Sequence, residues 1–219
     1  MKKLFPAFFL LITPTVAFAQ QKPEPQNGTQ SAIAFWHYSR CVVDSAPERI
    51  AELLSHFPWT SGDFEVARKL AVTRRDCLMP GDSLAFRSDL LQGAFASALL
   101  VKKYAHGVFP DFAKFPFAFG VEGLAGLDGD ARKRYISLVF AECVFRTNPA
   151  ATLAVLRVEP FSAADTTAFT ELGSTMSACL PLQTGDQVKF TRSALRNFLG
   201  IASYESDKRV TSTTSAGAH

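Results

Sequence analysis

Two pairs of cysteines with the same spacing constrain this chain more than any other feature. Cys41 and Cys77 are 36 positions apart (77 − 41), and so are Cys143 and Cys179 (179 − 143). The shared spacing indicates a duplication, in which the second copy follows the first by 102 positions (143 − 41). Such a unit is much longer than the roughly 20–50 residues of a solenoid or propeller repeat. We therefore expect two tandem, related halves rather than an array.

The match between the copies extends beyond the cysteines. After a two-residue insertion in the second copy, the turn residues also align. The matched residues include Cys41-Val42 with Cys143-Val144, Pro47 with Pro149, Asp63 with Asp165, and Gly81-Asp82 with Gly185-Asp186. This recurrence reports what the fold of each unit requires and does not by itself indicate a shared functional site.

The spacing of apolar residues predicts an all-α fold with about four helices in each half. Thr60 to Asp63 and Ser162 to Asp165 have the pattern of a capping box, which predicts the start of a third helix in each copy. Ser88 and Thr191 are expected N-caps of the fourth helices. The other predicted helices cover residues 32–45, 47–54 and 89–104 in the first half and residues 135–145 and 192–204 in the second.

Four cysteines in an exported chain indicate two disulfides, because an oxidising compartment keeps paired thiols oxidised. Four cysteines allow three pairings. The duplication favours Cys41–Cys77 and Cys143–Cys179, each closing its own half, with crossed pairing between the halves as the alternative. Each bridge is expected to contribute about 3–4 kcal/mol by loop entropy. The absence of a Cys-x-x-Cys motif argues against thiol redox chemistry or haem attachment.

The N-terminus has the pattern of a secretory signal peptide. Lys2 and Lys3 precede a mostly apolar run over residues 4–16, and Ala17-Phe18-Ala19 is a small-x-small cleavage site. The run is shorter than a spanning helix and contains prolines, so a membrane anchor is the weaker interpretation. We expect cleavage after Ala19, no membrane span in the mature chain, and a periplasmic or secreted location.

The charge of the mature chain argues against a nucleic-acid partner. Removing residues 1–19 removes two lysines and leaves 21 basic against 20 acidic residues (23 − 2 and 20), a net charge of about +1. Nucleic-acid binding requires clustered Lys and Arg that displace counterions. The expected partner is instead an unknown protein or envelope component, and the expected oligomeric state is a monomer.

The composition along the chain divides it into six segments. Residues 20–31 are rich in Gln, Pro and Gly and residues 206–219 are small and polar, so both are expected to be disordered. The expected order is a signal peptide at 1–19, a disordered linker at 20–31, helical repeat 1 at 32–104, a connection at 105–130, helical repeat 2 at 131–205 and a disordered tail at 206–219.

The connection is the one segment without a counterpart in the other copy. It ends in a glycine-rich stretch and contains five phenylalanines: Phe109, Phe112, Phe115, Phe117 and Phe119. A connection of this length is usually functional or a linker. We favour burial of these rings in the seam between the halves over the alternative, an apolar surface for a partner or ligand.

Residues with catalytic or metal-binding chemistry do not form a recognisable pattern. His37, His56, His106 and His219 lack metal-ligand spacing. The nucleophile elbow, the His-Glu-x-x-His motif and the Gly-rich phosphate loop are all missing. The sequence therefore predicts no catalytic residue, cofactor or metal.

Asp82 and Asp186 recur in the two copies, beside Arg87 and Arg192 respectively. Because the pair recurs, we favour a structural ion pair bracing the turn against the fourth helix. A carboxylate site with perturbed pKa is the weaker alternative.

A family resemblance rests on the motif residues of the second half. These are Ala141-Glu142-Cys143-Val144, Cys179-Leu180, Phe190 and Ser193-Ala194-Leu195-Arg196. The pattern resembles small exported alphaproteobacterial proteins with a duplicated Cys-x35-Cys helical unit. The resemblance implies a helical, disulfide-bonded fold in the periplasm and implies no activity. The first half departs from the pattern after Cys77.

Two classes of function remain open. The first is an exported interaction or structural module without catalytic activity, which uses the phenylalanine-rich connection or the groove between the halves. The alternative is a hydrolase-like periplasmic enzyme with a site assembled in that groove. A deep polar pocket with perturbed carboxylates, histidines or arginines favours an enzyme, whereas a shallow apolar surface favours a module.

Overall fold

The computed structural model describes residues 26–78, 88–180 and 190–216, and the regular structure in these ranges is entirely helical. Its eight α-helices confirm the predicted all-α class. They are α1 Gln26–Ser45, α2 Pro47–Ser55, α3 Ser61–Thr73, α4 Ser88–Lys103, α5 Gly129–Thr147, α6 Pro149–Arg157, α7 Ala163–Cys179 and α8 Arg192–Ala216. Short 3₁₀ helices cover Arg75–Cys77, Phe112–Lys114 and Val121–Leu124.

Both predicted disulfides are present, one in each half. Cys41–Cys77 joins α1 to the 3₁₀ turn that follows α3, with a Cα–Cα distance of 5.5 Å. Cys143–Cys179 joins α5 to the last residue of α7, with a Cα–Cα distance of 5.7 Å. The crossed alternative is therefore wrong. Each bridge holds the first helix of its half against the end of the third.

The chemistry at the helix starts follows the sequence closely. Pro47 and Pro149 open α2 and α6 at a position where a missing backbone N–H costs nothing. Thr60 and Asp63 form the complete capping box at the start of α3. Thr191 caps α8, because its hydroxyl accepts a bond from the Ala194 N–H at 3.2 Å.

The second capping box is only half formed. The Ser162 hydroxyl accepts the Asp165 N–H at 3.1 Å, as predicted. The Asp165 carboxylate accepts the N–H of Phe161, at 2.9 Å, and not that of Ser162. Asp165 is thereby aimed at a neighbouring helix, where it meets two arginines.

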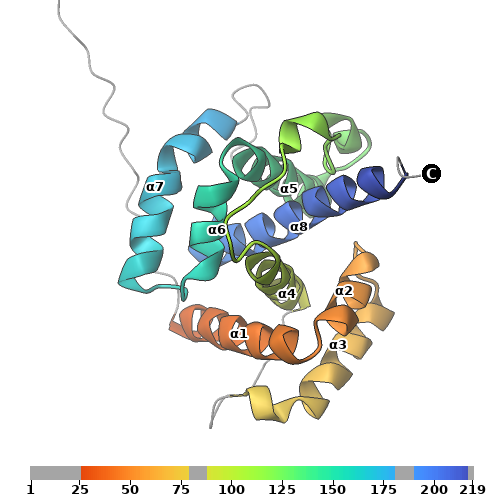
Figure 1. Cartoon of the computed structure of the whole chain (residues 1–219), viewed down its shortest axis with the longest axis vertical. Helices are drawn as coiled ribbons and strands as arrows, with labels where there is room; N and C mark the ends of the chain where they lie inside the picture. Colours follow the sequence, from red (N-terminus) through yellow and green to blue (C-terminus); the bar gives the residue numbers. More distant parts are fainter. Residues whose placement is uncertain (1–25, 79–87, 181–189, 217–219) are drawn as a thin grey trace, which may run out of the picture.

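Helices α4 and α8 cross at the centre of the molecule, with α1–α3 on one side and α5–α7 on the other (Figure 1). Two glycines permit their close contact. A Cβ on Gly200 would lie 2.5 Å from the carbonyl oxygen of Gly93, and a Cβ on Gly93 would lie 2.6 Å from that of Asn197. Both are closer than real side chains approach, so larger residues would force these helices apart.

The two hydrophobic cores share helix α4. Its N-terminal part contributes Leu91 and Phe95 to the core of α1–α3, while Leu100 near its end and Tyr104 directly after it belong to the core of α5–α8. Tyr204 of α8 packs against both cores. The helix order is the same in the two halves, and the two cores are connected through α4 and Tyr204.

The predicted disorder of the tail is wrong for residues 206–216, which form the end of α8. Distant contacts favour this extension. Ser206 donates to the buried Glu142 carboxylate at 2.9 Å. Asp207 accepts from Lys103 Nζ at 2.7 Å and from the Tyr104 hydroxyl.

The predicted linker is also partly wrong, because residues 26–31 begin α1. Several of these residues are half-buried, so burial adds to the backbone hydrogen bonds of the helix. Residues 20–25 and 217–219 lie outside the described ranges.

Several other predictions fall outside the residues that the structure describes. They concern the signal peptide at 1–19, the turns Gly81-Asp82 and Gly185-Asp186, and Arg87. Among the described helices, none combines the length and the apolar character needed to cross a membrane.

Candidate functional site

The phenylalanines of the connection mostly face inward. Phe112 and Phe119 are 3% and 6% exposed and belong to the core of the second half. Phe109 and Phe115 are half-buried, and Phe117 is 56% exposed. The positions of Phe112 and Phe119 agree with the burial interpretation, so five rings do not form a continuous partner surface.

Ring contacts fasten the connection to both halves. Phe112 meets Phe145 of α5 edge-on, with 4.6 Å between ring centroids. Phe119 meets Phe57 of the first half in the same way at 5.6 Å. Phe117 lies under the guanidinium group of Arg146, 4.0 Å from its Cζ. The connection is therefore packed against both halves along the seam.

Glu142 and Arg146 of α5 bind the backbone of the connection. The Glu142 carboxylate is fully buried and accepts the N–H groups of Ala118 and Phe119 at 2.8 and 2.7 Å. Arg146 donates to Glu142 at 3.4 Å and to three carbonyl groups of the connection. This buried acid and base satisfy backbone groups that an irregular segment leaves free.

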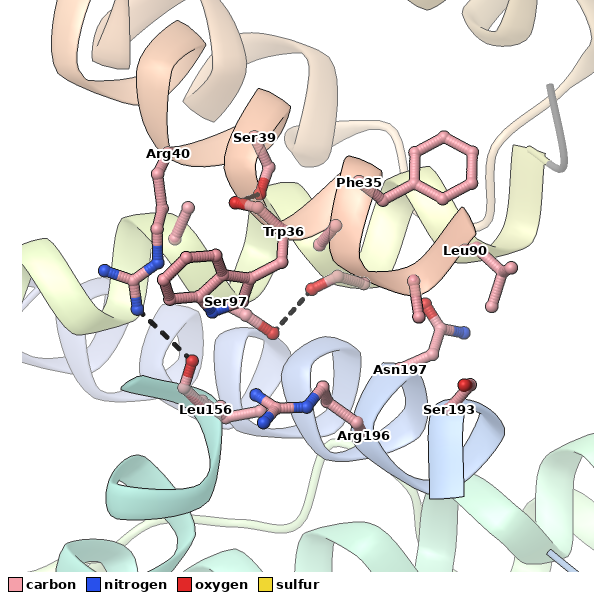
Figure 2. A pocket seen from close by; sticks show the side chains of 14 residues that line it. Phe35, Trp36, Ser39, Arg40, Leu90, Ser97, Leu156, Ser193, Arg196 and Asn197 are labelled. Atoms are coloured by element: carbon pink, nitrogen blue, oxygen red, sulfur yellow. Dashed lines mark hydrogen bonds between the residues drawn. The ribbon is translucent and has the colours of Figure 1, made fainter. Parts of the chain in front are cut away.

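The candidate functional site is a pocket at the seam, between α1 and α4 of the first half and α6 and α8 of the second (Figure 2). Its volume is about 40 Å³, enough for a few water molecules or the end of a small ligand. Most of its wall is apolar, from residues that include Phe35, Leu90, Ala94, Ala98 and Leu156. Its polar lining comes from Trp36, Ser39, Arg40, Ser97, Ser193, Arg196 and Asn197.

Arg40 bridges the two halves at one edge of the pocket. Its guanidinium group lies over the Trp36 ring, 4.2 Å from the centroid. It donates across the seam to the carbonyl oxygen of Arg157 at 2.6 Å and to that of Leu156 at 3.4 Å. These carbonyls end α6, where a cation is favoured by the helix dipole.

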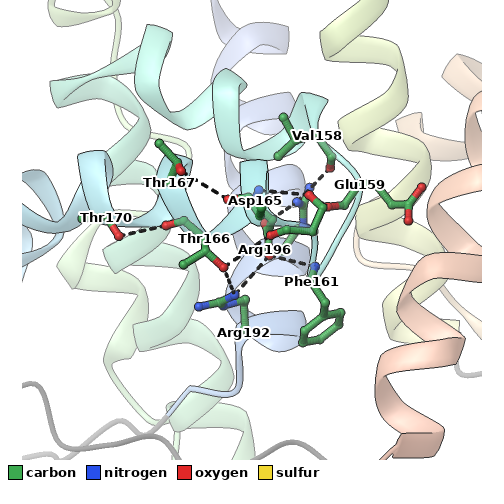
Figure 3. A network of polar contacts seen from close by, with 11 residues as sticks. Val158, Glu159, Phe161, Asp165, Thr166, Thr167, Thr170, Arg192 and Arg196 are labelled. Atoms are coloured by element: carbon green, nitrogen blue, oxygen red, sulfur yellow. Dashed lines mark hydrogen bonds and ion pairs between the residues drawn. The ribbon is translucent and has the colours of Figure 1, made fainter.

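Arg196 enters the pocket from α8 and is held by the second half. One of its terminal nitrogens, Nη2, donates to Asp165 Oδ1 at 2.7 Å and to the carbonyl of Val158 at 2.9 Å (Figure 3). Asp165 is fully buried and also accepts from Arg192 at 3.4 Å. A single carboxylate thus faces two guanidinium groups.

The environment of the pocket lowers the pKa of both its arginines, Arg40 and Arg196. Burial is the main cause that lowers the pKa of Arg196, and Asp165 opposes it. Burial also lowers the pKa of Arg40, and the charges of Arg196 and Arg157 lower it further. Guanidinium groups stay protonated in proteins, so Arg40 and Arg196 both remain positively charged at the pocket.

Four buried polar atoms around the pocket lack a hydrogen-bond partner. They are Trp36 Nε1, Ser193 Oγ, Arg196 Nη1 and Asn197 Oδ1. Ser193, Arg196 and Asn197 are each more than nine-tenths buried. Buried polar groups are normally paired, because leaving one unpaired costs about 1–3 kcal/mol. Their gathering at one pocket is the strongest indication of binding in the described residues.

The histidines in the described ranges do not line this pocket. His37 Nε2 lies 3.2 Å from Glu159 across the seam, and His56 Nδ1 lies 2.9 Å from Asp63. Within the described ranges, no group of three His, Cys, Asp or Glu side chains could hold a metal. Arg192 binds Asp165, whereas its predicted partner Asp186 lies outside the described ranges.

Sequence reasoning missed the pocket residues. Trp36, Arg40 and Asn197 belong to no motif, and Arg196 stood out only as part of a family resemblance. One signal was present, because Arg196 and Arg192 lie four positions apart and therefore on one face of a helix. Nothing in the sequence placed Asp165 opposite them.

The chain was compared with family models, with curated proteins and with solved structures, and none of them matches it.

Proposed function

We propose that this chain is an exported helical interaction module without catalytic activity, and that the seam pocket is its recognition site. The observation that carries the proposal is the set of four unpaired buried polar atoms at an apolar pocket built by both halves. A ligand that supplies their hydrogen bonds would recover the free energy lost by burying them. Such a site binds its ligand with both apolar and directional contacts.

The chemistry of the pocket favours binding over catalysis. The charged side chains of its lining are Arg40 and Arg196. Guanidinium groups hold anions and carbonyls well but do not exchange protons near neutral pH. The arrangement therefore supports recognition more directly than the hydrolase-like alternative, which needs a base and a nucleophile.

Two features support export. The first 19 residues have the pattern of a cleaved signal peptide. The two disulfides are typical of proteins that fold in an oxidising compartment.

The experiment that tests this function is native mass spectrometry of the full chain, expressed with its own N-terminus and purified from the periplasm of a bacterial host. The wild type is compared with Ala94→Phe, which places a ring in the pocket. The matched control is Ala131→Phe, at an exposed position near the start of α5. Circular dichroism and the mass of the oxidised chain check that every variant folds.

We expect a small molecule to co-purify with the wild type and with Ala131→Phe, and to be absent from Ala94→Phe. Equal occupancy of all three would contradict a recognition site at the seam, as would no bound molecule in any. Conversion of the released molecule by added protein would instead support the enzyme alternative. Recovery of the chain from the cytoplasm with an intact N-terminus would contradict export.

A further inference from the structure

We infer that the seam pocket binds the carboxylate end of a small aliphatic monocarboxylic acid. The carboxylate would accept from Arg196 Nη1 and Trp36 Nε1, and the alkyl chain would lie on the apolar wall. This inference rests on the proposed function, because it names the ligand class of the same pocket.

The balance of charge around the pocket favours an anion. Arg192 and Arg196 share one carboxylate, that of Asp165, so this group keeps one net positive charge. Arg40 adds another, and it is bound to backbone carbonyls and to the Trp36 ring. Asp44, whose negative charge acts on Arg40, also pairs with Lys102 at 3.5 Å, and Glu159 across the seam faces His37 at 3.2 Å.

The free hydrogen-bonding capacity is mainly that of donors. Trp36 Nε1 and Arg196 Nη1 can only donate hydrogen bonds, whereas the Ser193 hydroxyl can donate or accept. Asn197 Oδ1 can only accept, but it lies against Gly93 on α4, where even a Cβ would be 1.9 Å away. Figure 2 shows Trp36 and Arg196 reaching the space between α1 and α8 from opposite helices. A carboxylate, with two acceptor oxygens, matches this set of donors.

The wall of the pocket selects against strongly hydrated anions. Phe35, Leu90 and Ala94 lie beside Ala98 and Leu156 in its lining. Phosphate or sulfate would lose its hydration there and gain few donors in return, whereas an alkyl chain gains from burial. The volume of about 40 Å³ restricts the buried part to a short chain.

The test is isothermal titration of the purified, disulfide-bonded chain with hexanoate and with its neutral amide, hexanamide. We expect saturable binding of hexanoate at one site, and binding of hexanamide at least about ten-fold weaker because it lacks the charge-assisted bonds. Trp36→Phe keeps an aromatic ring and removes one donor, so hexanoate should bind about ten-fold more weakly. Asn197→Asp places a negative charge in the lining of the pocket and should abolish hexanoate binding through charge repulsion.

The control variant is Asn148→Asp, which adds the same charge at the start of α6, at the opposite end of that helix from Leu156. It should bind hexanoate as the wild type does. Thermal melts of each variant confirm that the chain is folded before titration.

The outcomes separate this inference from the proposed function. Equal binding of hexanoate and hexanamide would overturn the carboxylate inference and leave a recognition site at the seam. Equally tight binding of chloride or phosphate would overturn the role of the apolar wall. No binding of hexanoate, while another molecule co-purifies, would overturn the carboxylate inference and leave the recognition site. Hexanoate binding that survives Ala94→Phe would place the ligand elsewhere and overturn both.

Discussion

At the scale of single residues, Asp63 shows how a helix cap becomes sensitive to pH. Its carboxylate accepts the Thr60 N–H at 2.8 Å and the Thr60 hydroxyl at 2.7 Å, and it lies 2.9 Å from His56. The backbone bond from Thr60 is the main cause that lowers the pKa of Asp63 to about 2, followed by the Thr60 hydroxyl and His56. The folded chain therefore binds a proton at Asp63 less readily than the unfolded chain does.

We predict that Asp63 contributes stability above its unfolded pKa of about 3.9, and that this contribution is lost as pH falls from about 4 to 2. Asp63→Asn should lower stability at pH 7 and flatten the dependence of stability on pH in that window. Urea unfolding between pH 2 and pH 7 measures both effects. Asp130→Asn, at an exposed site on α5, is the control and should keep the wild-type pH dependence. Parallel pH curves for Asp63→Asn and wild type would contradict the prediction.

A second residue-scale prediction concerns Arg146. It is the only cation within 4 Å of the buried Glu142 carboxylate in the described part of the chain. Arg146→Met should cost about 3–5 kcal/mol, because it leaves a buried carboxylate without its counter-charge. It should also release the connection, whose carbonyls Arg146 holds.

Urea unfolding measures the loss of stability, and limited proteolysis measures cleavage within residues 105–128. Arg134→Met, at an exposed position of the same helix, should change stability by less than about 0.5 kcal/mol. A connection that resists proteolysis in Arg146→Met would show that ring contacts alone hold it.

At the scale of whole elements, local chemistry decided what could be predicted from the sequence. The start of α3 was predictable because Thr60 and Asp63 act on backbone groups within three residues. The end of α8 was not, because Ser206 and Asp207 are held by partners more than sixty positions away. The composition of that segment resembles a disordered tail until those partners are in place.

The pocket was unpredictable for the same reason. The cysteine spacing predicted the disulfides because a duplicated unit must close on itself. The site instead combines α1 and α4 with α6 and α8, and no spacing within one half reports how the halves meet. The sequence suggested a groove between the halves as one of two places to search, but it placed no particular residue in that groove.

The contact between α4 and α8 leads to a prediction in which tertiary structure overrides helix propensity. Gly→Ala within a helix normally stabilises it by up to about 1 kcal/mol. At Gly200 the new Cβ would lie 2.5 Å from a rigid backbone oxygen of α4. Gly200→Ala should therefore destabilise the chain by about 1–3 kcal/mol.

Gly62→Ala provides the matched comparison. Gly62 lies in the first turn of α3, is exposed, and a Cβ there meets only the Thr60 hydroxyl at 3.6 Å. The same substitution should be neutral or slightly stabilising at this site. Thermal unfolding of both variants measures the difference, and shifts of the same sign would contradict the proposed close contact.

At the scale of the whole molecule, the two halves differ in the residues that join them. Arg40 on α1 and Glu142 on α5 occupy equivalent positions, 102 apart (142 − 40), yet carry opposite charges. Arg40 reaches across the seam to the end of α6, whereas Glu142 anchors the connection. Two positions with the same spacing from their cysteines thus make different contacts, and both contacts join the halves.

This joining predicts a single unfolding transition. Leu100 of α4 and Tyr104, which directly follows that helix, lie in the core of the second half, so that core cannot survive unfolding of α4. Removing either disulfide, as Cys41→Ala/Cys77→Ala or as Cys143→Ala/Cys179→Ala, should cost about 3–4 kcal/mol by loop entropy. The expected fall in the melting temperature is roughly 10 °C in each case.

Calorimetry of the two double variants decides whether the halves unfold together. One transition with a matching van't Hoff enthalpy, shifted similarly in both variants, is expected if the shared interior couples them. Two transitions, of which only one responds to each pair of substitutions, would show independent halves. In that case α4 and α8 would form an interface between separate domains, and a ligand at the seam would stabilise their association more than their folding.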